Sequence, residues 1–138
     1  MGKDSHIPAG STPWPPGDWF LDWTSSVDLI AVERQEVLVR GNTAFQEYEI
    51  FVGALWGKTL ILDGRLQSAE VDEFIYHEMM AHVPLMAMKA PRRVLIVGGG
   101  DGGVLREVLK HPSVEEATLC EIDRSVIDLS LTYFPEIA

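Results

Sequence analysis

Residues 28–68 alternate apolar with polar or charged side chains in the two-residue period of a β-strand, most clearly around Tyr48, Ile50 and Val52. The dipeptide Asp63-Gly64 separates two short runs of strand-forming residues, which is a strong hairpin signal. Because turn signals divide runs that each have one apolar face, the pattern predicts a small antiparallel sheet.

At residue 70 the period changes to that of a helix. Apolar positions recur at spacings of three and four, and Pro84 is expected to kink or end the helix. We therefore place a helix at about residues 70–83, with residues 85–89 as a further turn. Its apolar stripe consists of Phe74, His77, Ala81 and Leu85. Its acids, interpreted as a solvated face, are Glu70, Asp72, Glu73 and Glu78.

The rest of the chain follows the order strand, loop, helix, strand, helix. A short apolar run at 94–97 predicts a strand buried on both faces of a parallel sheet, and the glycine-rich segment 98–103 follows it at once. Helices are predicted at 104–110 and 125–133, with a second parallel strand at 117–122. This order is the opening of a doubly wound, Rossmann-like fold.

The chain therefore divides into three segments. Residues 1–26, rich in proline and tryptophan, are predicted to form an N-terminal arm, with Trp19, Phe20 and Trp23 packing on this chain or on a neighbouring subunit. Residues 27–69 form the antiparallel β domain. Residues 70–138 comprise a linking helix and the start of the Rossmann-like domain. The fold class is α/β.

The glycine loop carries the first chemical signal. Gly98, Gly100 and Gly103 match G-x-G-x-x-G between a predicted strand and a predicted helix, and Glu121 follows at the end of the next strand. Glycines permit a sharp turn and a close approach of ligand to backbone, and a carboxylate at that position can accept hydrogen bonds from ribose hydroxyls. The alternative is a plain strand-to-helix turn with a solvated Glu121.

Asp101, inside the loop, narrows the class of ligand. A carboxylate there would repel a pyrophosphate, which argues against a dinucleotide dehydrogenase. It favours a ligand with positive charge and no phosphate, and S-adenosyl compounds fit that description. The alternative interpretation of Asp101 is an exposed loop acid or an Asx-turn.

Composition limits the possible partners. The 138 residues carry a formal net charge of -10, which argues against a nucleic-acid surface. No apolar run reaches membrane-spanning length, no secretory signal is evident, and Cys120 is the single cysteine. The histidines His6, His82 and His111 have no spacing with Cys120 that makes a metal site. We expect a cytoplasmic protein without bound metal, nucleic acid or membrane.

Several stretches resemble the polyamine aminopropyltransferases, and within them the spermidine synthases. The similarity covers about residues 19–138 and is strongest in 62–80 and 94–107, with further matches at 45–49, 111–115 and 120–123. The resemblance implies transfer of an aminopropyl group from decarboxylated S-adenosylmethionine, as co-substrate, to putrescine or a related amine, releasing 5'-methylthioadenosine. It also implies dimers or tetramers, with no metal and no prosthetic group.

The resemblance assigns roles by motif position. For the nucleotide these are Gln46 at the thioether end, Gly98 and Gly100 in the loop, Asp101 at the aminopropyl ammonium and Glu121 at the ribose. For the amine they are Tyr76 and His77 lining a channel, with Gln67 as the wall between two pockets. From the helical pattern alone, His77 is interpreted as a packed core histidine.

The family's amine-activating acid would lie beyond residue 138, so no catalytic residue is predicted in this chain. We expect the chain to be an N-terminal half, inactive alone, with a second polypeptide or the remainder of the domain completing the site. Two alternatives stay open: an S-adenosylmethionine-dependent putrescine N-methyltransferase, and a non-catalytic subunit that binds nucleotide or polyamine. The identity of the amine also stays open.

Overall fold

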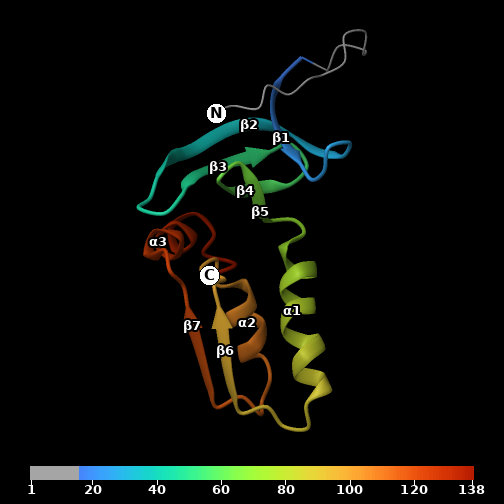
Figure 1. Ribbon diagram of the computed structural model, residues 1–138, viewed down its shortest axis with the longest axis vertical. Coiled ribbons are helices and arrows are strands. Elements are labelled where there is room, and N and C mark those ends of the chain that lie inside the picture. The colour runs from blue at the N-terminus through green and yellow to red at the C-terminus, as the bar shows by residue number, and fades with distance from the viewer. Residues whose placement is uncertain (1–15) are drawn as a thin grey trace.

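The computed structural model describes residues 16–138, which form two packed parts (Figure 1). The first is a five-stranded antiparallel sheet, and the second is a parallel strand pair with three helices. The sheet, in the spatial order of its strands, consists of β1 (Asp18–Trp23), β2 (Leu29–Asn42), β3 (Glu47–Gly53), β4 (Gly57–Leu62) and β5 (Arg65–Ala69). The second part consists of α1 (Glu73–Ala87), β6 (Arg93–Val97), α2 (Gly103–Leu109), β7 (Glu116–Cys120) and α3 (Arg124–Tyr133).

The antiparallel sheet confirms the strand pattern of the sequence. Asp63 and Gly64 join β4 to β5 with φ values of 47° and 70°, so both central residues take the left-handed conformation of a tight hairpin turn. One face of the sheet buries Phe20 and Phe51, whose ring centroids lie 5.9 Å apart. The guanidinium of Arg34 lies over both rings, at 5.4 and 5.3 Å, and covers this core with a cation.

The predicted arm is wrong for residues 18–23, which form strand β1 and pair with β2 from Asp18↔Arg34 to Trp23↔Leu29. The prolines that argued against regular structure end at Pro16, so nothing prevents the backbone beyond them from pairing. Phe20 packs into the core of the sheet, as expected for this aromatic group, whereas Trp23 is 36% exposed. Residues 1–15 of the predicted arm lie outside the described part of the chain.

Two expectations for the second part also change. Helix α1 runs without interruption from Glu73 to Ala87 and contains Pro84, where an end or a kink was expected. Strand β6 is buried on one face only within residues 16–138: Ile96 is buried, whereas Leu95 and Val97 are 65% and 81% exposed. The reason is that α1 and α2 both contribute to one core with β6, on the side of Ile96 (Figure 1).

The two parts share a core and several polar contacts. Ile50 and Leu60 of the antiparallel sheet pack with Phe134 and Ile137, which follow α3. The ammonium of Lys58 donates a hydrogen bond to the Tyr133 carbonyl at 3.0 Å. Figure 1 shows α3 against the antiparallel sheet, so the end of the parallel sheet faces that sheet. None of the helices in residues 16–138 is long and apolar enough to span a membrane.

Candidate functional site

The glycine loop is tied to the end of β7. The Gly98 amide donates to the Cys120 carbonyl at 2.9 Å, and Gly102 donates to Gly99 at 3.0 Å to close a turn. Gly98 and Gly99 have φ values of 80° and 73°, a conformation that side chains with a Cβ rarely adopt. The loop therefore needs glycine for its path between β6 and α2, in agreement with the sequence motif.

Glu121 follows β7 directly and is held by backbone amides. Its Oε2 accepts from the Gly100 amide and its Oε1 from the Asp123 amide, both at 3.0 Å. A Cβ on Gly100 would lie 2.9 Å from Cγ of Glu121, so glycine is required for this approach. Both carboxylate oxygens keep lone pairs, which leaves them able to accept hydrogen bonds from a diol.

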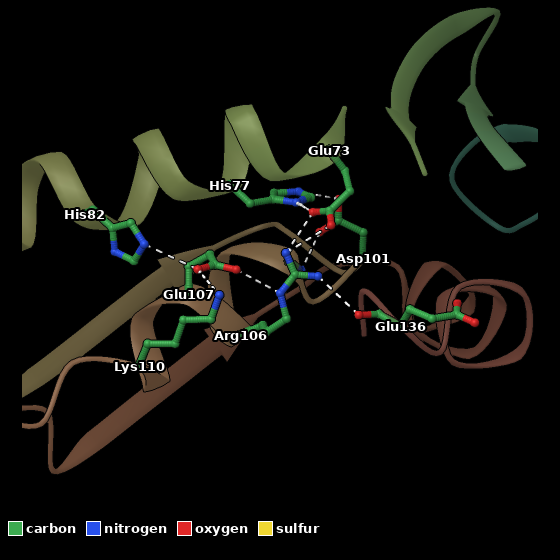
Figure 2. A network of polar contacts seen from close by, with 9 residues as sticks. Glu73, His77, His82, Asp101, Arg106, Glu107, Lys110 and Glu136 are labelled. Carbon is green, nitrogen blue, oxygen red and sulfur yellow. Dashed lines mark hydrogen bonds and ion pairs between the residues drawn. The ribbon is translucent and has the colours of Figure 1, made fainter. Parts of the chain in front are cut away.

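Asp101 meets His77 across the loop and helix α1 (Figure 2). The imidazole Nε2 of His77 lies 3.1 Å from Oδ2 of Asp101, and its Nδ1 is in hydrogen-bond contact with Oε2 of Glu73. The other oxygen of Asp101 accepts from the Gly103 amide at 3.2 Å, which is an Asx-turn. Asp101 is thus both a turn residue and a partner of a buried histidine. His77 is 1% exposed, which confirms the interpretation as a buried histidine, while its role in an amine channel stays a prediction.

The charges around His77 shift the pKa values of His77 and Glu73 toward their ionised forms. Burial lowers the pKa of His77, but the hydrogen bonds and charges of Asp101 and Glu73 outweigh burial and raise this pKa above its usual range. Burial raises the pKa of Glu73, but Arg106 and His77 outweigh it and lower that pKa. The arrangement therefore favours the imidazolium form of His77 and the carboxylate form of Glu73.

Arg106, Glu107 and Lys110 extend this network into the interface of α1 and α2, and the sequence reasoning missed all three. It also missed Glu73, which was assigned to a solvated face although its side chain is only 10% exposed. A usable signal was the spacing, because Glu73 and His77 lie four residues apart on one helix, and Glu107 and Lys110 three apart on another.

Two cavities meet at the residues expected to line the amine channel. A cavity of about 690 Å³ extends along β6 and is lined by Asp101 among others, and a second of about 430 Å³ lies next to β5. Both are bordered by Gln67, Tyr76 and His77. That shared border is compatible with the prediction that Gln67 separates two pockets. Tyr76 is 60% exposed, and its ring meets that of His77 edge-on.

Gln46 lies in the loop between β2 and β3 and contacts the residues that follow β7. Its Nε2 donates to Oδ2 of Asp123 at 3.0 Å, and the Thr43 hydroxyl donates to the same oxygen at 2.6 Å. Burial raises the pKa of Asp123, but these bonds and the Ser125 amide outweigh it and lower the pKa. Because Asp123 also binds Glu121 through its amide, Gln46 is brought to the end of β7 beside the expected ribose acceptor.

The site thus has two groups of predicted residues: Gln46 and Glu121 at the end of β7, and Asp101, Tyr76, His77 and Gln67 around the cavities. Gly98 and Gly100 form the backbone turn between them. No cluster of three or more metal-ligating side chains occurs among residues 16–138. An antiparallel sheet followed by β-α-β-α with this loop defines the class: the opening of a Rossmann-like nucleotide-binding domain with an added N-terminal β domain.

Comparison with known proteins identifies the family. The model of the spermine/spermidine synthase domain matches residues 73–138. A polyamine aminopropyltransferase of Desulforudis audaxviator is 52% identical over 120 residues, which is 87% of this chain and 44% of that protein. Spermidine synthase 1 of Pisum sativum is 45% identical over 95% of this chain and 40% of its own length.

Solved structures agree with the sequence comparison. A spermidine synthase in complex with the transition-state analogue AdoDATO superposes with a TM-score of 0.82 and 42% identity, over 86% of this chain and 41% of that one. Spermidine synthase from Thermotoga maritima gives the same TM-score and identity, and 42% of it is covered. The chain belongs to the polyamine aminopropyltransferase family, whose members include the spermidine synthases. It spans less than half the length of these relatives.

Proposed function

We propose that this chain provides the donor-binding part of an aminopropyltransferase that uses decarboxylated S-adenosylmethionine and putrescine. The observation that carries the proposal is the position of Asp101, directly after Gly100 and against the larger cavity. A carboxylate there suits the ammonium of the donor's aminopropyl group, while Glu121 suits the ribose of the same molecule. Family membership supports the assignment.

The reaction suits a site that mainly positions its substrates. The carbon next to a sulfonium is already electrophilic, so the amine forms the new C–N bond as the C–S bond breaks, and one proton leaves the amine. Spermidine and 5'-methylthioadenosine are the proposed products. In this proposal Gln46 contacts the thioether end, Gln67 divides the pockets, and Tyr76 and His77 line the amine channel.

The matched residues cover only 44% and 40% of the two relatives. We propose that the group that removes the amine's proton belongs to the part of such a protein that follows the present residues in the family. We therefore also propose that turnover needs this second part, that putrescine is the amine acceptor, and that the protein works as a dimer or tetramer in the cytoplasm. A non-catalytic subunit would bind the same nucleotide without supporting turnover when the remainder of the domain is supplied.

Calorimetry with three ligands tests the proposal. We expect decarboxylated S-adenosylmethionine to bind more tightly than S-adenosylmethionine, whose carboxylate would face Asp101. Asp101→Asn should weaken the decarboxylated donor by roughly ten- to a hundredfold, the value of a charge-assisted hydrogen bond. It should leave 5'-methylthioadenosine, which has no ammonium, almost unchanged. Asp128→Asn, on the exposed face of α3, is the matched control.

Equal affinity for the two S-adenosyl compounds would favour the N-methyltransferase alternative. Binding of none of the three ligands would refute donor binding by this chain.

A further inference from the structure

A line of alternating charges runs from the larger cavity into the interface of α1 and α2 (Figure 2). Three carboxylates alternate with three basic side chains, so the line is neutral overall when His77 carries its proton. In order these are Asp101, His77, Glu73, Arg106, Glu107 and Lys110.

The inner part of this line is tightly paired. Nη2 of Arg106 lies 3.0 and 2.9 Å from the two carboxylate oxygens of Glu73, and its Nε donates to Glu107 at 2.9 Å. Nζ of Lys110 lies 2.6 Å from the other oxygen of Glu107, which is 1% exposed. His82 also approaches that oxygen, at 3.3 Å. Glu73 is therefore fixed as an anion in front of His77.

The imidazole of His77 has a carboxylate at each nitrogen. A neutral imidazole has one N–H and one bare nitrogen, so it can donate to only one of two carboxylates, and its lone pair would face the other. The ring is also enclosed: a Cβ on Gly103, the first residue of α2, would lie 2.1 Å from Nδ1. Water therefore cannot stand between the ring and either acid without moving the helix.

We propose that His77 is a positively charged positioning residue, which donates Nδ1–H to Glu73 and Nε2–H to Asp101 and so fixes the carboxylate that faces the donor's ammonium. This inference rests on the proposed function for its link to the donor. In this proposal His77 does not accept the proton of the amine, because both of its ring nitrogens already carry protons. The proton released by the acceptor amine then goes to another group.

Of the groups around His77, the two carboxylates favour this state, whereas the Arg106 cation behind Glu73 opposes it. Its own helix contributes the Glu73 carboxylate and the edge of the Tyr76 ring, the loop contributes Asp101, and α2 contributes Arg106 through Glu73. The two acids raise the pKa of His77 more than burial lowers it. Deprotonation at higher pH would place a lone pair against one acid and release the Asp101 side chain.

The first test is nitrogen NMR of the imidazole, with no ligand present. We expect His77 to show two protonated ring nitrogens at pH 7, and its titration midpoint to lie above the ordinary value near 6.5. Glu73→Gln should lower this midpoint, because one of the two carboxylates is lost. A His77 that is neutral at pH 7 in the wild-type chain overturns the proposal whether or not any nucleotide binds.

The second test separates positioning from folding. His77→Phe keeps a ring against Gly103 but removes the donor to Asp101. It should reduce the affinity for decarboxylated S-adenosylmethionine about tenfold more than that for 5'-methylthioadenosine. His82→Phe changes a ring on the same helix whose Nδ1 lies 2.9 Å from Nε2 of His111. Within residues 16–138, His82 meets the charge line only at Glu107 and does not contact Asp101, so this variant should leave the ratio of affinities unchanged. An unchanged ratio in His77→Phe, with intact 5'-methylthioadenosine binding, overturns the proposal. If the wild-type chain binds neither decarboxylated S-adenosylmethionine nor 5'-methylthioadenosine, the proposed function is refuted instead.

Discussion

Asp123 connects the two parts of the fold, and replacing it with asparagine tests that connection. Its Oδ2 accepts from Thr43 at 2.6 Å and from Gln46 at 3.0 Å, both in the loop between β2 and β3. Its Oδ1 accepts from the Ser125 amide at 3.0 Å and caps α3. Asparagine keeps the shape and the cap, but its NH2 group takes the place of Oδ2, so Thr43 and Gln46 must turn to accept from it and both interdomain bonds become neutral.

The cost follows from those two interdomain bonds. A hydrogen bond to a charged group contributes about 1.5–3 kcal/mol, against about 0.5–1.5 kcal/mol for a neutral pair. Replacing Asp123 by Asn should therefore cost about 2 kcal/mol, or roughly a thirtyfold change in the unfolding equilibrium. Because the pKa of Asp123 is lowered in the fold, this contribution is present above its ordinary value of 3.8 and is lost as pH falls through the lower native value.

Urea unfolding at pH 7, followed by circular dichroism, measures the effect as a lower midpoint at unchanged slope. Asp128→Asn is the matched control, since Asp128 lies on the helix that Asp123 caps and, among residues 16–138, its carboxylate pairs with Arg124 alone, at the surface. That change should cost no more than about 0.5 kcal/mol. If Asp123→Asn and Asp128→Asn shift the midpoint equally, the carboxylate of Asp123 does not hold the two parts together.

Three further changes test other parts of the structure. Gly103→Ala should destabilise the chain by about 1–3 kcal/mol in the same urea assay, because the new methyl group would overlap the ring of His77; an unchanged midpoint would show that the ring can move. Phe51→Ala should cost about 3–5 kcal/mol by thermal unfolding, whereas Phe45→Ala, at 57% exposure, should change little; equal losses would contradict the described core. The pKa of Glu73 is lowered in the fold, so its carboxylate stabilises the fold at pH values above the ordinary pKa of 4.5, and this contribution is lost as pH falls through the lower native pKa. Glu73→Gln should therefore make the free energy of unfolding less dependent on pH on the acid side. An unaltered dependence on pH would refute this.

Local sequence signals were enough for the order of elements from residue 28 onward and for the glycine loop. The two-residue period predicted the antiparallel sheet, and the change of period at residue 70 predicted α1. The glycine motif predicted a turn at the end of β6 and Glu121 at the end of the next strand, and the structure shows that the two are joined by the hydrogen bond from Gly100 to Glu121. These features depend on neighbouring residues and on backbone conformations that only certain residues adopt, so the linear chain contains them.

Contacts between distant residues were decided only by the tertiary structure. The pairing of β1 with β2 drew residues 18–23 into the sheet, and tertiary packing of α1 carried its helix through Pro84. The charges around His77 come from positions 24 and 33 residues apart, as in the pairs His77–Asp101 and Glu73–Arg106. No periodicity links such positions. The sequence by itself determined the glycine turn and indicated candidate site residues such as Asp101 and Glu121. Packing of α1 on α2 determined that Glu73 is buried and that His77 stands between two acids, because charge and burial at a site depend on what the fold brings next to it.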